Sequence, residues 1–459
     1  MSLKIGLLVL YLELYDERCP EIRPEIDRFA DEVAKQFRDR AIDVVTAPLC
    51  RTTAETRQAV GRFKEAGVDL IATLHAAYSP SLVSADVLAG CGLPLVMLDT
   101  TPDATFDTAA LGNGRLMFNH GIHGVQDLAN VLRRLGKRFE IVAGCGADPA
   151  FFDRAIQLFR GIRGGRNFRN QRIGLIGKPF AGMGDFSVPY PMLKQQFGIE
   201  IVTGDADALA DHLEKADAPD VLNELGEIRK RYPAGSATDA ELADAIRSGR
   251  ALRRFLEREK LNGFSMNFMA FNGGDKLPVV PFLEASLAQS RGIGYAGEGD
   301  VLTAALVGAV LSVLPESTFS EMFCPDWQGN RVYLSHMGEV NPELLAEPRL
   351  DPKPFPFTPA GDPVIAAGLL APGKAMLVNI LPEAGDKLTL LAHPVEILGG
   401  ESALPHEIGG WLRPEKELKT FLEDYSRAGG THHLLISRGG SVELFQAMAA
   451  ELGIGFKVI

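Results

Sequence analysis

Residues 292–311 read GIGYAGEGDVLTAALVGAVL, which is a short apolar run, a glycine-rich turn and an apolar helix pattern. This succession predicts one strand–helix unit of an α/β fold. Glu298 lies in the turn among glycines, close to the predicted start of the helix. One interpretation is structural, because Asp300 can cap the helix and Glu298 can be a favourable charge beside its positive end. The other interpretation, a functional carboxylate, depends on the rest of the chain.

The alternation of strands and helices runs through residues 1–168. Short runs rich in Val, Ile and Leu occur at residues 4–11, 42–47, 69–74, 94–99 and 139–144, and amphipathic stretches lie between them at residues 22–39, 53–66, 81–89 and 120–135. Strands that alternate with helices indicate βαβ units and a parallel sheet covered on both faces. We therefore expect residues 1–168 to form a doubly wound α/β domain.

A second α/β domain is predicted over residues 169–315. The preceding segment, RGIRGGRNFRNQ at residues 160–171, is rich in Gly and Arg without an apolar period, which is typical of a linker. An apolar run at 172–176 then begins the new domain, and a long charged helix pattern occupies residues 238–260. A strand-like run at 263–268 leads on towards the turn that contains Glu298.

The composition changes after residue 315, where Pro and Gly become frequent. Strand-like pieces at residues 331–336, 374–380 and 386–398 follow one another with few helices. This pattern predicts a β-rich, barrel-like C-terminal domain over residues 316–459. Its last part, residues 415–459, has the pattern helix, strand, helix, strand.

Composition and charge exclude several classes of protein. The chain has 459 residues, 46% of them hydrophobic and 23% charged, and a formal net charge of −12. A negative chain lacks the basic face that a nucleic-acid partner requires. The five cysteines are odd in number and form no CxxC pair, so they favour a reducing cytoplasm over a disulfide framework or a thiolate zinc site. The apolar N-terminal run is too short to span a membrane.

Nucleotide-binding motifs are missing from the sequence. No GxGxxG follows the first predicted strand, and no GxxxxGK[ST] occurs, so no nucleotide cofactor is expected. Residues 176–186, IGKPFAGMGDF, do carry a GxG after a strand, but Phe186 and Pro189 interrupt the helix that a phosphate loop needs. We expect this segment to be a substrate-facing loop.

Four segments of the second half offer carboxylate or imidazole groups beside strand or helix ends. They contain Glu298, Glu321 in TFSEMF, His336 in LSHMGE, and the pair His432 and His433 in AGGTHHLLIS. Each has a structural alternative: a solvated acid for Glu321, a core histidine for His336, and a turn for the histidine pair. A set of two carboxylates and two imidazoles suits a divalent ion such as Mn²⁺ or Co²⁺. Since neighbouring strand residues face opposite sides, only one of the two adjacent histidines is expected to point at a common metal.

The sequence resembles the L-arabinose isomerase family and, more distantly, the L-fucose isomerases. The resemblance rests on GIGYAGEGDVLTAAL, LSHM and the late GGxHH, on FNHGIHGVQDLANVL at residues 118–132, and on LHAAYSP at residues 74–80. It implies a Rossmann-like N-terminal domain, a central α/β domain and a β-rich C-terminal domain. It also implies a cytoplasmic homo-oligomer, a hexamer or tetramer, with active sites between subunits.

By this resemblance, the metal ligands would be Glu298, Glu321, His336 and His433, with His432 as the adjacent alternative to His433. The metal would be Mn²⁺, with Co²⁺ or Mg²⁺ as alternatives. The stretch between Glu321 and His336 is slightly shorter than in the family, which makes Asp326 an alternative to Glu321.

The same resemblance assigns substrate contacts. His123 matches a histidine that the family supplies from a neighbouring subunit, and Phe268 and Tyr78 lie where the family lines its pocket with aromatic rings. His432 is the fourth predicted substrate-binding residue.

The implied reaction is the isomerisation of an aldose to a ketose through an enediolate. A divalent metal would polarise the carbonyl, Glu298 and Glu321 would act as general base and acid, and His336 and His433 would hold the ion. Arabinose isomerases carry a Gly-Ser-Gln-His-type loop after the first strand, whereas this chain reads YLELYDERCP at residues 11–20. Another pentose, a deoxyhexose, a polyol or a cyclitol is therefore an alternative substrate.

Two other classes of function stay open at this point. One is a metal-dependent epimerase or lyase that uses the same enediolate chemistry. The other is a non-catalytic sugar-binding protein, because paired α/β domains also build periplasmic-type receptors.

Overall fold

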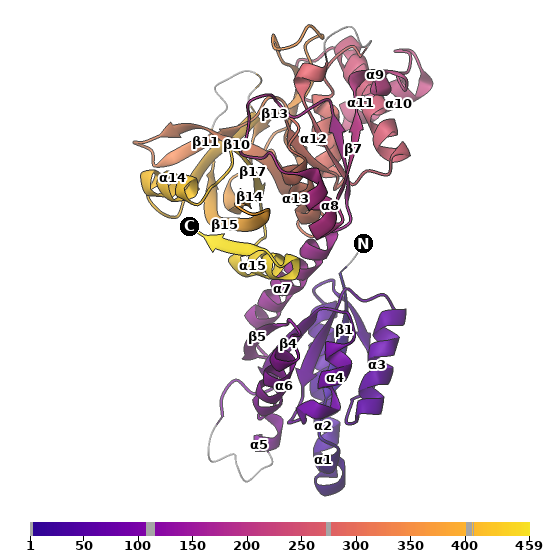
Figure 1. The fold of residues 1–459 in the computed structure, drawn as a ribbon, viewed down its shortest axis with the longest axis vertical. Helices are drawn as coiled ribbons and strands as arrows, with labels where there is room; N and C mark the ends of the chain where they lie inside the picture. The colour runs from indigo at the N-terminus through magenta and orange to yellow at the C-terminus, as the bar shows by residue number, and fades with distance from the viewer. Residues whose placement is uncertain (1–2, 107–114, 272–276, 401–405, 407) are drawn as a thin grey trace. The chain divides into compact units, whose positions relative to one another are not determined.

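The computed structural model describes residues 3–106, 115–271, 277–400, 406 and 408–459 (Figure 1). The chain divides into two compact units, Met1–Arg163 and Gly164–Ile459. Both contain parallel sheets with helices, and the second also contains a β-rich part, so the predicted α/β class is confirmed. The finer division into three domains, with boundaries at residues 168 and 315, stays a prediction.

The first unit is built on a five-stranded parallel sheet with the order β2-β1-β3-β4-β5. The strands are β1 (Lys4–Leu10), β2 (Asp43–Thr46), β3 (Leu70–His75), β4 (Leu95–Thr101) and β5 (Glu140–Cys145). The helices that precede α7 are α1 (Glu13–Arg18), α2 (Arg23–Arg38), α3 (Thr53–Glu65), α4 (Ala85–Ala89), α5 (Arg115–Phe118) and α6 (Ile122–Arg134). The predicted doubly wound sheet is confirmed, and its strand order reverses between β1 and β3, where such folds bind ligands.

The predicted linker at residues 160–171 is mostly helical. Helix α7 spans Pro149–Phe168, and the boundary between the two units falls inside it. Gly165, one of the glycines that suggested a linker, serves close packing instead. A Cβ atom at Gly165 would lie 2.9 Å from Glu451 Cβ and 3.0 Å from Met448 O of α15 (Val442–Leu452). The prediction of an irregular linker was therefore wrong because helix packing requires the same small residue.

The second unit begins with a four-stranded parallel sheet of order β7-β6-β8-β9. Its strands are β6 (Arg172–Ile176), β7 (Glu200–Gly204), β8 (Gly263–Met266) and β9 (Gly294–Gly297). The helices of this part are α8 (Tyr190–Phe197), α9 (Ala206–Ala210), α10 (Pro219–Arg231), α11 (Asp239–Arg258), α12 (Phe282–Ser290) and α13 (Val301–Leu311). Helix α13 packs tightly on β9, since a Cβ at Gly294 would lie 2.1 Å from Ala304 O. Tight packing of α13 on β9 positions the turn that contains Glu298.

The rest of the second unit is a nine-stranded, largely antiparallel sheet. Its order is β12-β13-β16-β11-β10-β17-β14-β15-β18, and an extra pairing of β16 with β15 closes six strands into a barrel. The strands are β10 (Ser317–Asp326), β11 (Arg331–Ser335), β12 (Arg349–Pro352), β13 (Val364–Leu369), β14 (Gly373–Glu383), β15 (Lys387–Leu398), β16 (Ile408–Pro414), β17 (His433–Ser437) and β18 (Gly455–Val458). Helix α14 spans Leu418–Arg427. The predicted β-rich, barrel-like part is confirmed.

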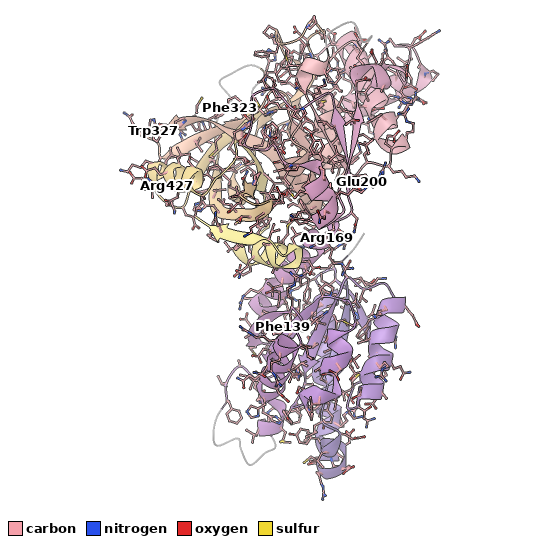
Figure 2. The ribbon with its side chains drawn as sticks, viewed as in Figure 1. Phe139, Arg169, Glu200, Phe323, Trp327 and Arg427 are labelled. Atoms are coloured by element: carbon pink, nitrogen blue, oxygen red, sulfur yellow. The ribbon has the colours of Figure 1, made fainter. Side chains whose placement is uncertain are left out.

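The hairpin of β10 and β11 has two different ends. Towards the turn, Phe323 on β10 and Trp327 in the turn itself are exposed (Figure 2). At the other end, the Cα of Glu321 on β10 is paired with that of Ser335 on β11 and with that of His433 on β17. His336 follows β11 directly, so the register of three neighbouring strands brings Glu321, His336 and His433 to the same place.

Two further expectations concern the whole chain. All five cysteines are free in the structure. Among the helices of the described residues, none has both the length and the apolar character needed to cross a membrane.

Candidate metal centre

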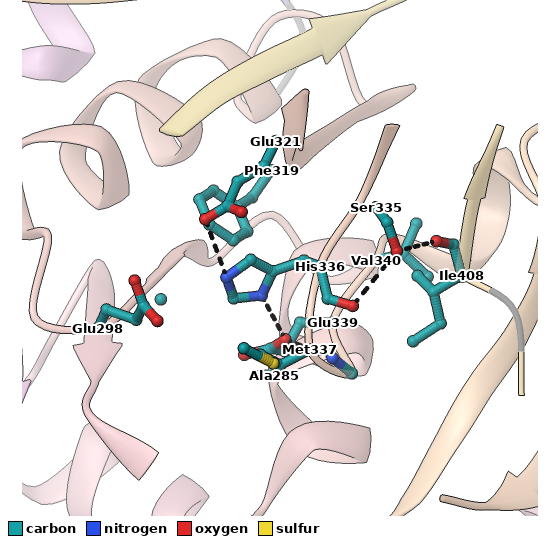
Figure 3. A network of polar contacts seen from close by, with 12 residues as sticks. Ala285, Glu298, Phe319, Glu321, Ser335, His336, Met337, Glu339, Val340 and Ile408 are labelled. Carbon is teal, nitrogen blue, oxygen red and sulfur yellow. Dashed lines mark hydrogen bonds and ion pairs between the residues drawn. The ribbon is translucent and has the colours of Figure 1, made fainter. Parts of the chain in front are cut away.

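The structure brings Glu298, Glu321, His336 and His433 together. One nitrogen or oxygen atom of each lies within 4.8 Å of the corresponding atoms of the others, and we call these residues the four-residue cluster. His433 Nε2 lies 3.1 Å from Glu321 Oε1 and 3.5 Å from Glu298 Oε2. His336 Nε2 lies 3.4 Å from Glu321 Oε1, and this contact is drawn in Figure 3. The predicted convergence of four residues from distant parts of the sequence is therefore observed. Their role as ligands stays a proposal.

The turn after β9 holds Glu298 in an uncommon backbone conformation. Glu298 has φ of +61°, and Gly299 follows with φ of +91°. The Glu298 N–H donates to Met266 O at 2.9 Å, and its carbonyl accepts from the N–H of Phe180 at 2.8 Å. Ser265 Oγ accepts from the Gly299 N–H at 2.9 Å. These bonds from β8 and from the loop after β6 keep the conformation in place, so the main chain sets the direction of the Glu298 side chain.

The glycines beside Glu298 are required by close contacts. A Cβ atom at Gly297 would lie 2.6 Å from Cε1 of His336, and one at Gly299 would lie 2.5 Å from the Cα of Pro179. Any side chain at Gly297 would therefore push the His336 imidazole away from the cluster. The spacing of glycines around Glu298 reflects the space that the cluster needs.

Each cluster histidine is held by a carboxylate on its other ring nitrogen. Glu339 Oε2 lies 2.7 Å from His336 Nδ1, and Asp300 Oδ2 lies 3.0 Å from His433 Nδ1 (the Glu339 contact is drawn in Figure 3). Glu339 also accepts hydrogen bonds from the Tyr295 hydroxyl and, at 2.7 Å, from the Gly338 N–H. Ligating histidines in metalloproteins have this support, which fixes the ring and turns its free nitrogen towards the ion.

Asp300 therefore has two roles. Its Oδ1 accepts from the N–H of Thr303 at 2.8 Å and caps α13, as the sequence predicts. Its Oδ2 contacts His433, which the sequence did not suggest because His433 is 133 residues away. Glu339 was also missed, although its position three residues after His336 was a usable signal.

Charge interactions within the cluster shift its pKa values so that the charged forms are favoured, against the effect of burial. Burial alone raises the pKa of Glu298, but the nearby imidazoles of His432, His433 and His336 lower it to about 2. The pKa of Glu321 is lowered in the same way by His336 and His433 against its burial. Burial lowers the pKa of His336, and the carboxylates of Glu339 and Glu321 raise it to about 9. Both cluster carboxylates are thus ionised at neutral pH.

The cluster fits a divalent cation. The Nε2 atoms of His336 and His433 are buried and have no hydrogen-bond partner, although both rings are held at Nδ1. Unpartnered buried nitrogens are unfavourable in a protein unless something else binds them. Two imidazole nitrogens and two carboxylates make a donor set suited to ions such as Mn²⁺ and Co²⁺, with Mg²⁺ as a harder alternative.

The sequence analysis expected His432 and His433 to point to opposite faces of a strand. This expectation was wrong. His433 is the first residue of β17, whereas His432 precedes the strand, and the alternation of strand side chains does not apply to the pair. His432 Nε2 lies 3.7 Å from Glu298 Oε2, almost as near as His433 Nε2. The four-residue cluster nevertheless contains His433 and not His432.

Asp326, the alternative to Glu321, lies elsewhere in the hairpin. It pairs with Arg331 at 2.8 Å and accepts from the Gly329 N–H at 2.9 Å in the turn between β10 and β11. Glu321, not Asp326, contributes to the four-residue cluster.

The remaining predicted substrate contacts lie in three places. Phe268, in a short 3₁₀ helix after β8, is buried among Phe180, Phe355 and Phe357. His123 is exposed near the start of α6 in the first unit. Tyr78 is half-buried in the loop after β3 of the same unit. Their contacts with substrate stay predictions.

The fold and the cluster define a class of protein, an α/β chain with a β-barrel part whose strand ends carry a candidate metal centre. Comparison with protein families narrows this class. The L-arabinose isomerase central domain matches residues 192–315, and the L-arabinose isomerase C-terminal domain matches residues 316–455. The chain belongs to the L-arabinose isomerase family.

Relatives cover most of the chain at low identity. The L-arabinose isomerase of a Nocardioides species is 25% identical over 90% of this chain and 84% of its own length. That of Serratia proteamaculans is 26% identical over 96% of this chain and 91% of its own. A solved periplasmic solute-binding protein from Actinobacillus succinogenes 130z, with bound D-allose, is 15% identical over 68% of this chain and 92% of its own, with a TM-score of 0.17.

Proposed function

We propose that this protein is a divalent-cation-dependent aldose–ketose isomerase. The observation that carries the proposal is the convergence of Glu298, Glu321, His336 and His433 into one buried cluster, in a chain whose relatives are named L-arabinose isomerases. His336 and His433 would hold the cation together with the two carboxylates. The cation would supply Lewis-acid polarisation of the substrate carbonyl.

The chain's own residues supply the proton transfers. Isomerisation moves the C2 proton to C1 and the O2 proton to O1, so the overall reaction neither gains nor loses atoms or electrons. Glu298 and Glu321 are both ionised near neutral pH, because their pKa values are lowered, and an ionised carboxylate can accept a proton. One of them would carry the proton from C2 to C1, and the other would transfer the proton between the two oxygens.

The substrate would differ from L-arabinose in its distal part. In the first unit, the segment that departs from the family loop contains Tyr15, whose hydroxyl lies 2.9 Å from Nε2 of His120. Tyr15 lies in α1, which follows β1, and His120 precedes Gly121, where an added Cβ would lie 2.2 Å from the main-chain oxygen of His75 at the end of β3. The strand order of the parallel sheet reverses between β1 and β3, which is a common place for ligand contacts. A changed loop at this edge supports another pentose, a deoxyhexose or a related polyol or cyclitol derivative as substrate.

The test is a panel of aldoses, ketoses and cyclitols incubated with the purified protein in D₂O and followed by proton NMR. We expect one aldose–ketose pair to interconvert, with activity lost on chelation and restored by Mn²⁺ or Co²⁺. A product epimerised at one carbon, or an eliminated product, would identify an epimerase or a lyase instead. A protein that binds sugar but neither binds Mn²⁺ nor changes the sugar would be a binding protein.

A further inference from the structure

The loop between β6 and α8 reaches the histidine pair next to the cluster. Oδ2 of Asp185 accepts hydrogen bonds from the main-chain N–H of His432 at 2.8 Å and from its Nδ1 at 2.7 Å. The ring of Phe186 stacks on His433, with centroids 5.0 Å apart and planes at 5°. The loop that the sequence predicts to face the substrate therefore contacts both histidines.

His432 points its other nitrogen at the cluster. Its Nε2 lies 3.7 Å from Glu298 Oε2 and 3.8 Å from Glu321 Oε1, distances too long for a hydrogen bond. The Nε2 atom is buried and has no hydrogen-bond partner. The side chain as a whole is 37% exposed and that of Asp185 is 38% exposed, so solvent reaches this pair beside the cluster.

The chemistry of the pair determines the tautomer of His432. An ionised carboxylate only accepts hydrogen bonds, so the proton of a neutral imidazole must be on Nδ1 when Asp185 contacts that atom. The main-chain N–H of His432 can only donate, so the Asp185 Oδ2 that contacts both this N–H and Nδ1 is an acceptor. The Nε2 lone pair of His432 then faces the space beside Glu298 and Glu321.

We propose that Asp185 is a positioning residue that holds His432 in the Nδ1–H tautomer, so that Nε2 accepts a hydrogen bond from a hydroxyl group of the substrate. This inference rests on the proposed function, because it takes the substrate to be a polyhydroxy compound. It adds an acceptor beside the four-residue cluster that is not itself part of the cation's ligand set. Asp185 would act on the substrate only through His432.

The first test reads the tautomer without any turnover. Long-range proton–nitrogen NMR of the Mg²⁺-loaded protein, with labelled histidines and at a pH where His432 is neutral, gives the shifts of both ring nitrogens. The signals of His432 are assigned by their loss in His432→Gln. We expect the Nδ1–H form in the parent protein and a shift towards the Nε2–H form in Asp185→Ala. An Nε2–H form in the parent protein would overturn the proposal.

The second test is a double-mutant cycle of Asp185→Asn and His432→Gln, with Asp217→Asn as the control because Asp217 is an exposed aspartate of the same unit. Each single variant should lower kcat/KM by about 10- to 100-fold, as loss of supporting hydrogen bonds does elsewhere. The double variant should be no slower than His432→Gln alone, because Asp185 acts through His432. Effects that multiply would show that Asp185 has only a general structural role.

The third measurement separates His432 from the cation's ligands. Mn²⁺ affinity measured by calorimetry should change less than about threefold in both single variants, and a tenfold loss would make His432 a ligand and overturn the proposal. If the parent protein turns over no sugar, the proposed isomerase activity fails on its own. Titration of pentitols into the Mg²⁺-loaded protein then tests the acceptor role, which fails if His432→Gln binds them as tightly as the parent.

Discussion

Glu298 is held in a backbone conformation that a side chain disfavours. A residue other than glycine at positive φ costs about 1–3 kcal/mol and persists only where its surroundings enforce it. Here Met266, Phe180 and the hydroxyl of Ser265 supply those surroundings through main-chain hydrogen bonds. Such conformations cluster at functional sites, which fits the role proposed for the Glu298 carboxylate.

Replacing Glu298 by Gln tests this role directly. The amide keeps the size of the side chain but accepts no proton, so we expect kcat to fall by about 100- to 10,000-fold while the protein stays folded. Turnover and the circular dichroism spectrum are the two measurements. The exposed Glu227 on α10 gives the matched control, and Glu227→Gln should behave as the parent. Full activity in Glu298→Gln would remove Glu298 from the reaction.

A second prediction concerns the space at Gly297. The Cβ of Gly297→Ala would meet the imidazole of His336 at 2.6 Å, so the ring must move and Mn²⁺ affinity should fall at least ~10-fold. A Cβ added at Gly226 on α10 would have nothing within 4 Å, so Gly226→Ala should leave the affinity unchanged and stabilise its helix slightly. Calorimetric titration of Mn²⁺ compares the two variants. Equal affinities would mean that the His336 ring does not depend on Gly297.

At the residue scale, the sequence predicted the residues of the four-residue cluster but not the carboxylates that contact its histidines. Glu298 and His336 are marked by glycine-rich and strand-end surroundings that can be seen in the sequence. Asp300 already had a sufficient explanation as a helix cap, so its contact with His433 had no separate signal. The contact of Asp185 with His432 could not be predicted either, because aspartates are common in exposed loops for reasons unrelated to function.

At the scale of elements, periodic apolar patterns were enough to predict most strands and helices. The runs at residues 4–11 and 69–74 became β1 and β3, and the charged pattern at 238–260 became α11. The pattern failed at α7, where glycines in the contact with α15 resemble those of a flexible segment. The pairing of β10 with both β11 and β17 could not be read from the sequence either, since β17 is more than a hundred residues away.

The C-terminal end of β3 provides a prediction about pH. His75 is completely enclosed there, and its burial lowers its pKa to about 4, although Asp127 opposes the shift. Gly124 lies so close that a Cβ would be 2.3 Å from the His75 ring. The unfolded chain, with a pKa near 6.5, binds a proton before the folded unit does. The first unit should therefore lose about 3 kcal/mol of stability as the pH falls from about 6.5 to 4.

Hydrogen exchange of the β3 amides, extrapolated to global opening, measures this loss. His75→Gln should flatten the pH dependence in that window, whatever its effect on stability at neutral pH. His123→Gln is the control, because His123 is exposed in the same unit. The same slope in the parent and in His75→Gln would assign the acid sensitivity to other groups.

At the scale of the whole molecule, the chain combines two compact units, and the complete four-residue cluster belongs to the second. A ligand that binds only the folded form stabilises the part that holds it. We expect Mn²⁺ at about 100 times its Kd to slow exchange in β10 and β17 by about 100-fold, which corresponds to about 2.7 kcal/mol. Exchange in β1 and β3 should stay the same.

Equal protection of both units, or none in β10 and β17, would contradict this location of the cation.

The resemblance to the L-arabinose isomerases also predicts that several copies of the chain assemble. The expected hexamer or tetramer can be measured by light scattering with and without Mn²⁺.

The structure separates the groups that would hold the cation from the loop that supports His432. Glu298, His336 and His433 are almost fully enclosed at the ends of strands, whereas Asp185 lies on an exposed loop. Because the two groups of residues are separate, the loop can be varied in a selection experiment without changing the residues that would hold the cation. A library that randomises the loop positions around Asp185 would leave the enclosed carboxylates and imidazoles intact, so the range of accepted sugars could be reselected while the ion stays bound.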